Sequence, residues 1–204
     1  MISEPLVLDL SHWETVDSWE EVKNSGIVGI IYKATEGSSY TDDTYEEAKD
    51  GAEAAGLLWG AYHFLRPGDM LQQARFFVDV VGTGLDLYCA DHEDYGVSIE
   101  ELKEFMLEVL RMTGKHCILY SGHVLKEQIG NSTDEVLGKF RLWIAHYTGN
   151  SQPDWPKQIW PQWWLWQYSE TGEAPGISDE TDLNRYSGAG PSQLTHEWSR
   201  SMQD

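Results

Sequence analysis

Two acidic residues stand two positions apart in the segment 88–93. If this segment ends a strand, Asp91 and Glu93 point to the same side with Cα atoms roughly 6.6 Å apart, and His92 points away. Cleavage of a glycosidic bond uses such a pair, because one carboxyl protonates the departing oxygen while a second group stabilises positive charge at the anomeric carbon. Two close carboxyls shielded from water repel, so one keeps its proton near neutral pH and can act as the acid.

Spacing alone leaves two interpretations of this pair, a catalytic site or a solvated strand end. Acids make up 34 of the 204 residues, so pairs of this spacing also arise by chance, and Glu180 with Asp182 is a second example. Position adds an argument, since functional residues of parallel β/α barrels lie where strands end and the following loops begin. Asp9 ends the first apolar run of the chain, as Asp91 ends the fourth.

The elements that would position these acids alternate along the chain. Apolar runs predict strands at 6–10, 28–32, 57–64, 87–90, 117–120, 142–145 and 164–168, and helical patterns predict helices at 18–24, 43–55, 69–80 and 98–112. The strand runs are almost continuously apolar, which is typical of a parallel sheet covered on both faces. An ordinary eightfold barrel takes roughly 250 residues. We therefore predict an α/β fold, an irregular, abbreviated (β/α) TIM-like barrel, with residues 1–204 forming a single domain and no separate wall-binding module.

Composition excludes several classes of function. The net charge of −20, with only 14 basic residues, argues against nucleic-acid binding and against attraction to anionic membranes or wall polymers. No apolar run is long enough for membrane insertion, and the first five residues do not resemble an export signal. Cys89 and Cys117 lie in separate apolar runs, which favours two buried thiols in neighbouring strands over a disulfide. We expect a monomer.

Metal and nucleophile motifs are absent from the sequence. The seven histidines show no ligand spacing, and neither Gly-x-Ser-x-Gly nor a phosphate-binding glycine loop occurs. We therefore expect no metal and no cofactor. Aromatic side chains near strand ends can stack on sugar rings. Those at such positions are Tyr62, Tyr120, Trp143 and Trp166, each of which core packing would also explain. Tryptophans at 155, 160, 163 and 164 are expected to replace missing helical cover, although they could also extend a saccharide surface.

Seven segments occur in an order that resembles one known family. They are Val7–Trp13, Ile31–Gly37, Gly60–Phe64, Ala90–Asp94, Leu142–Tyr147, Trp166–Ser169 and Asp182–Tyr186. Together they resemble the lysozymes of glycoside hydrolase family 25, the Chalaropsis type, over about residues 6–186. The first segment departs from the family pattern, because Glu14-Thr15 stands where Gln-Gly usually follows the aromatic residue. This departure concerns the first βα loop and the pose of Asp9.

The resemblance implies an N-acetylmuramidase that cuts the β-1,4 bond between N-acetylmuramic acid and N-acetylglucosamine of bacterial peptidoglycan without a metal. By this resemblance Glu93 is the general acid/base, and Asp91 stabilises charge or orients the 2-acetamido group. Asp9 and Asp182 are further acids of the same cleft.

Lys33 and Glu36 match the second segment and would either bind substrate or pair with each other. The alternatives are a non-catalytic saccharide-binding barrel and a metal-dependent hydrolase that uses Asp91 and Glu93 as ligands. The expected site of action is the bacterial cell wall. Without a signal in the chain, a phage lysin (endolysin) released from the host cytoplasm and a protein with a removed leader both fit.

Overall fold

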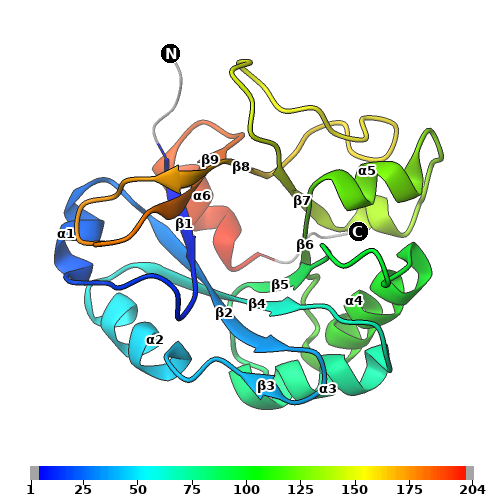
Figure 1. The fold of residues 1–204 in the computed structure, drawn as a ribbon, viewed down its shortest axis with the longest axis horizontal. Coiled ribbons are helices and arrows are strands. Elements are labelled where there is room, and N and C mark those ends of the chain that lie inside the picture. Colours follow the sequence, from blue (N-terminus) through cyan, green and yellow to red (C-terminus); the bar gives the residue numbers. More distant parts are fainter. Residues whose placement is uncertain (1–4, 201–204) are drawn as a thin grey trace.

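A computed structural model describes residues 5–200, and its strands close into a barrel (Figure 1). Eight strands form the closed ring in the order β1-β2-β4-β5-β6-β7-β8-β9, and β9 returns to pair with β1. The strands are β1 (Val7–Leu10), β2 (Gly29–Glu36), β4 (Leu58–Phe64), β5 (Tyr88–Asp91), β6 (Ile118–Ser121), β7 (Arg141–Ala145), β8 (Leu165–Gly172) and β9 (Thr181–Tyr186). A short β3 (Tyr40–Thr41) extends β2 outside the ring. The predicted α/β barrel is confirmed.

One strand of the ring runs against the others. Neighbouring strands from β1 through β8 are parallel, whereas β9 is antiparallel to both β8 and β1. The sequence analysis did not predict β9, and it follows β8 through a hairpin instead of a helix. This reversal places the beginning of β9 at the same end of the barrel as the carboxyl ends of the parallel strands.

Helices cover the outside of the barrel where the chain passes from one parallel strand to the next (Figure 1). They are α1 (Trp19–Asn24), α2 (Tyr45–Ala54), α3 (Met70–Val81), α4 (Ile99–Thr113) and α5 (His123–Ile129), followed by a 3-10 turn (Leu137–Lys139). Ser18, Asp69 and Ser98 cap the first, third and fourth of these, each accepting a backbone N–H bond on its side chain. Ser98 and Glu101 form a capping box, in which each side chain bonds to the backbone of the other residue.

Alternation along the strands divides the apolar side chains into two cores. Residues such as Leu8, Ile30 and Leu119 face outward and pack beneath the helices. Their neighbours Ile31 and Cys89 face the barrel interior, where they meet side chains from the other strands. Both strand faces are therefore buried, which explains the continuous apolar runs in the sequence. Cys89 and Cys117 are buried free thiols at the paired strands β5 and β6, as predicted.

The connection between β7 and β8 is covered by tryptophans in place of a helix. Trp155 and Trp163 are half-buried against the outer core, and Trp160 is buried in it. The indole N–H of Trp160 donates to the carbonyl of Phe140 at 2.8 Å, and that of Trp155 donates to the carbonyl of Trp160 at 2.9 Å. These contacts confirm the expected replacement of helical cover, while Trp164 instead faces the barrel interior.

The bottom of the barrel is closed by α6 (Pro191–Trp198), which the sequence analysis did not predict. Leu194 and Trp198 of this helix belong to the interior core. The Trp198 indole N–H donates to the carbonyl of Trp59 at 2.9 Å. A Cβ at position 29 would lie 2.6 Å from the Trp198 ring, so Gly29 is the residue type that lets the ring approach β2. With this end closed, the opposite end remains for a site.

Candidate active site

A pocket of about 80 Å³ opens at the end of the barrel where the parallel strands terminate. Its lining consists of acids and aromatic residues: Asp9, Tyr62, Asp91, Glu93, Tyr120, Trp143 and Asp182. All four predicted acids therefore meet in one place, although they come from three strands and from the loop after β5. Three of the four predicted aromatic residues join them. Asp91 and Glu93 face the same pocket, as their spacing predicts.

Asp9 and Asp182 are register partners across the antiparallel β1–β9 pair. The buried carboxyl of Asp9 accepts hydrogen bonds from the side-chain amides of Asn184 at 2.6 Å and Gln167 at 2.9 Å. Burial raises the pKa of Asp9 to about 6, although the hydrogen bonds from these two amides lower it. Burial and the charge of Asp9 raise the pKa of Asp182 to about 10, and its protonated carboxyl donates to Asp9. At neutral pH this pair holds one proton, on Asp182, and one negative charge, on Asp9.

Asp91 and Glu93 form the second carboxyl pair. Asp91 ends β5 and is only 5% exposed, whereas Glu93 lies two residues further on and is exposed at the pocket mouth. Burial raises the pKa of Asp91 well above its ordinary value, and the charges of Glu93 and Asp9 add to the shift. Desolvation also raises the pKa of Glu93, followed by the charges of Asp9 and Glu170. The pair therefore retains a proton at a pH where free carboxyls have lost it.

One oxygen of Asp91 has no hydrogen-bond partner among the described residues. Buried carboxylate oxygens are ordinarily satisfied, because a missing donor costs free energy. This atom belongs to a side chain that lines the pocket. A molecule in the pocket that carries an N–H or O–H group would supply the missing donor.

Two of the three aromatic residues of the pocket are fixed by hydrogen bonds to the amides that hold Asp9. The Tyr120 hydroxyl donates to Oε1 of Gln167 at 2.7 Å, and the Trp143 indole N–H donates to Oδ1 of Asn184 at 2.6 Å. The exposed Tyr147 also donates to Gln167, at 2.7 Å. A network thus runs from the aromatic walls through two amides to the buried charge of Asp9, so that few of its members can move independently.

Trp166 does not lie with the other predicted site aromatics. Its neighbours on β8 alternate in direction, so Gln167 faces the barrel interior and Trp166 faces outward. Trp166 is 1% exposed in the outer core, and its indole N–H donates to the carbonyl of His146 at 2.8 Å. The guanidinium of Arg185 lies 5.1 Å from its ring. The prediction that Trp166 lines a saccharide groove is corrected to a packing role.

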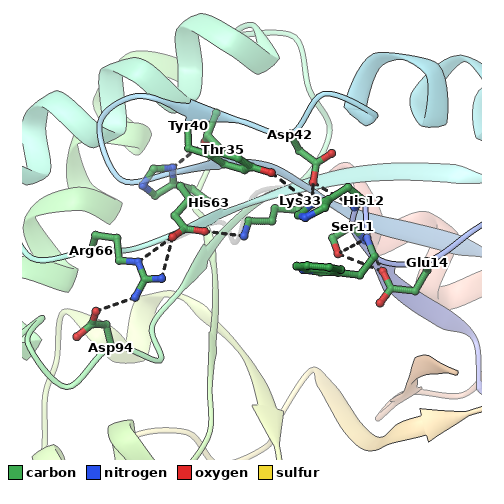
Figure 2. Close-up of polar contacts among 12 residues, drawn as sticks. Ser11, His12, Glu14, Lys33, Thr35, Tyr40, Asp42, His63, Arg66 and Asp94 are labelled. Atoms are coloured by element: carbon green, nitrogen blue, oxygen red, sulfur yellow. Dashed lines mark hydrogen bonds and ion pairs between the residues drawn. The ribbon is translucent and has the colours of Figure 1, made fainter. Parts of the chain in front are cut away.

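Lys33 and Glu36 pair with each other, with 2.6 Å between Nζ and Oε2. Glu36 also forms an ion pair with Arg66, and the Arg66 guanidinium forms a further ion pair with Asp94 at 3.1 Å (Figure 2). These cations hold the pKa of Glu36 below its ordinary value despite partial burial. Of the two functions considered for this pair, the structure shows the ion pair. Neither residue lines the acidic pocket.

The departure at Glu14 has a structural explanation. Its carboxylate accepts the backbone N–H of Ser11 at 2.8 Å and the Ser11 hydroxyl at 3.1 Å, which closes a tight turn after β1. Its charge also contributes to the raised pKa values of Asp9 and Asp182. Sequence reasoning missed Gln167 and Asn184 as site residues, although both stand in segments that carried the family resemblance. Alternation along a strand is the signal that could have found them. Asn184 stands two residues after Asp182 and so faces the same side, whereas Gln167 stands next to Tyr168 and faces the opposite side.

Two other features bear on alternative sites. Within residues 5–200, no group of three or more His, Cys, Asp or Glu side chains is arranged to hold a metal ion, and no helix is long and apolar enough to cross a membrane. A larger hollow of about 670 Å³ lies along α4, where it is lined by residues such as Leu71, Glu104 and Leu107. None of the pocket acids reaches that surface.

Comparison with known proteins places this architecture. A family model described as "Glycosyl hydrolases family 25" matches residues 8–177. The chain belongs to this family. As a family 25 member it is a glycoside hydrolase, and the acids gathered at the barrel mouth lie where such a barrel carries its chemistry.

Several proteins named as lysozymes are similar to this chain. Lysozyme M1 from Streptomyces globisporus is 30% identical over 200 residues, which cover 89% of this chain and 67% of that protein. The autolytic lysozyme of Clostridium acetobutylicum is 34% identical over 173 residues, covering 81% of this chain and 51% of that protein. The chain thus spans about two thirds and one half of these relatives. The bacterial lysozyme from Streptomyces coelicolor superimposes with a TM-score of 0.85 at 28% identity, covering 98% and 99% of the two chains.

Proposed function

We propose that this family 25 chain is a lysozyme that hydrolyses the β-1,4 bond between N-acetylmuramic acid and N-acetylglucosamine in bacterial peptidoglycan. The observation that carries the proposal is the meeting of two carboxyl pairs with raised pKa values in one pocket at the barrel mouth. Glycosidic cleavage needs one carboxyl that keeps its proton at working pH and another group beside it that bears or stabilises charge. Action at the bacterial cell wall follows from this substrate.

Glu93 is proposed as the general acid/base. It stands at the pocket mouth, where a polymer can reach it, and its raised pKa keeps a proton available. The Glu93 carboxyl gives this proton to the glycosidic oxygen as the bond from that oxygen to the anomeric carbon breaks. The resulting carboxylate then takes a proton from the water that attacks the anomeric carbon, which restores the starting state.

Asp91 is proposed to receive the 2-acetamido group of the sugar. Its unpartnered oxygen is an acceptor that lacks a donor, and an acetamido N–H is a donor of the right kind. A hydrogen bond to this oxygen favours the ionised form of Asp91. Because the two carboxyls compete for a proton, ionising Asp91 leaves the proton on Glu93, where cleavage requires it. Substrate binding would thereby set the protonation state.

Asp9 and Asp182 are proposed to position this chemistry. The charge of Asp9 contributes to the raised pKa of both Asp91 and Glu93, and its amide partners hold it in place. The neutral Asp182 can offer the pocket hydrogen-bonding capacity without adding a second charge. We further propose that the protein acts as a monomer.

Product analysis tests the proposal. Purified peptidoglycan incubated with the protein should lose turbidity, and the released fragments should carry N-acetylmuramic acid at their new reducing ends, identified by borohydride reduction and mass spectrometry. Excess chelator should leave the rate unchanged, whereas a metal-dependent hydrolase would stop. Binding of the polymer without any new reducing end would indicate a saccharide-binding barrel and contradict the proposal.

A further inference from the structure

Trp13 is held outward at the tip of the first βα loop. All ten tryptophans of the chain lie in the part that the structure describes, and Trp13, at 76% exposure, is the one classed as exposed. The loop is not slack. Glu14 ties back to Ser11, and the Ser11 hydroxyl accepts the backbone N–H of Trp13 at 3.3 Å. These hydrogen bonds fix the turn, and the turn holds the large apolar ring of Trp13 in solvent.

Two further rings extend this surface. The His12 ring lies 4.6 Å from that of Trp13 and 6.2 Å from that of Tyr40, which is 40% exposed. His12 is anchored by the buried Asp42, whose Oδ2 lies 2.7 Å from Nδ1 and also accepts the His12 backbone N–H (Figure 2). We call His12, Trp13 and Tyr40 the aromatic platform. Its rings come from the loop after β1 and from β3, and the Asp42 carboxylate holds His12 beside β3.

The platform lies at the same end of the barrel as the acidic pocket, where β1 and β2 terminate. Trp13 follows Asp9 by four residues at the end of β1, and Tyr40 belongs to the hairpin that extends β2. Lys33 of β2 links the platform to the pocket. Its Nζ is 5.4 Å from the centre of the Tyr40 ring, and its register partner on β4 is the pocket residue Tyr62. A polymer that leaves the pocket on the β1–β2 side would pass over these rings.

The chemistry of the platform fits a sugar ring. Pyranose rings present apolar faces that stack on indole and phenol rings, and their hydroxyls bond to polar groups at the edge, such as His12 and Lys33. The pocket itself holds about 80 Å³, too little for the several residues by which a polymer-cutting enzyme grips its strand. Bulk charge cannot provide this grip, because a protein of net charge −20 repels an anionic wall.

We propose that the aromatic platform is a distal glycan-binding subsite, in which Trp13 and Tyr40 stack on a sugar of the same strand that is cut in the pocket. The inference rests on the proposed lysozyme function and deepens it. Trp13 increases the affinity of the protein for long strands and takes no part in bond cleavage. Its loss should therefore be felt most with substrates long enough to reach both the pocket and the platform.

The test uses glycan strands freed of peptides by an amidase and separated into long strands and tetrasaccharides. For long strands, Trp13→Ala should raise KM about tenfold, the size of one lost stacking contact, with kcat changed less than twofold. For tetrasaccharides the rise in KM should be smaller. Trp13→Phe should recover most of the affinity, since it restores a ring. Leu107→Ala, which removes an exposed apolar side chain from α4, is the matched control and should match the wild type.

Several results would overturn the subsite. An unchanged KM of Trp13→Ala for long strands would do so, as would equal losses with long and short substrates. Failure of Trp13→Phe to recover affinity would exclude stacking. If Trp13→Ala instead changed the sedimentation coefficient of the protein, the platform would be a contact between copies. Absence of cleavage of either substrate by the wild type would contradict the lysozyme proposal itself, which separates the two failures.

Discussion

At the scale of single residues, the site is a problem of placing four carboxyl groups together without unfolding the protein. Two solutions operate side by side. Asp9 keeps its charge because two amides donate to it, and Asp182 keeps its proton because burial, and then repulsion by the charge of Asp9, disfavour its ionised form. One oxygen of Asp91 has no donor among residues 5–200, and the raised pKa values of Asp91 and Glu93 favour retention of a proton by this pair. The first pair is therefore proposed to position the site and the second to carry the reaction.

The proton on Asp182 predicts a pH-dependent stability. Its folded pKa of about 10 lies above the unfolded value near 3.8, so at pH 7 folding must take up a proton, and this cost grows as pH rises from the unfolded toward the folded pKa. Asp182→Asn removes the cost but keeps a donor toward Asp9. We expect the variant to be more stable than the wild type at pH 7 by at least about 1.4 kcal/mol, the equivalent of one pKa unit.

Urea unfolding at pH 7 and at pH 3.5 measures this effect. The difference between the variant and the wild type should shrink at the lower pH, where Asp182 is largely protonated in both states. Asp79→Asn, at an exposed position of α3, is the matched control and should show no difference at either pH. A variant that is less stable than the wild type at pH 7 would refute the assignment of the proton to Asp182.

At the scale of elements, the sequence predicted what local pattern determines. Strands from β1 to β8 (the two-residue β3 aside) and helices α1 to α4 follow from apolar runs and from caps such as Ser98. The pattern of β9 is different, because its inward side chains Asp182 and Asn184 are polar and become buried only by pairing with β1. The hydrophobic pattern of this segment by itself does not predict such a strand. The short α6 escaped prediction for a similar reason, since its burial depends on the open bottom of the barrel.

The site residues, too, could be predicted from the sequence only in part. Asp9, Asp91 and Glu93 follow from the rule that strand ends carry function, and Asp182 followed from the family resemblance alone. Gln167 and Asn184 were missed because their importance lies in a hydrogen-bond network across three strands. Trp166 was misplaced because its strand position was known while the side of the sheet it faces was not.

The cap of α4 gives a prediction for an element. Ser98→Ala removes the acceptor for the Glu101 backbone N–H and the hydroxyl that donates to the Glu101 carboxylate at 2.7 Å. The free energy of unfolding should fall by about 1 kcal/mol, the usual cost of losing an N-cap. Urea titration measures the loss, and Ser98→Thr, which keeps the hydroxyl, should lose less. Equal losses in the two variants would show that the cap contributes nothing.

At the scale of the whole molecule, charge sets how the protein meets its substrate. A net charge of −20 is unfavourable near anionic wall polymers, and salt screens this repulsion. The Debye length falls from about 30 Å at 0.01 M to about 8 Å at 0.15 M ionic strength. We therefore expect kcat/KM on intact walls to rise over this range, and to change little on peptide-free tetrasaccharides. A steady fall with added salt would show that electrostatic attraction drives binding instead.

Glu93 is the residue proposed to transfer the proton in glycosidic cleavage. Glu93→Gln keeps the size of the side chain and removes the transferable proton, so kcat on purified peptidoglycan should fall by more than about 100-fold, within the range for a general acid/base. Substrate binding and the thermal midpoint should stay close to the wild type. Glu104→Gln, the same change at an exposed position of α4, should retain full activity. Near-normal lysis by Glu93→Gln would contradict this role of Glu93.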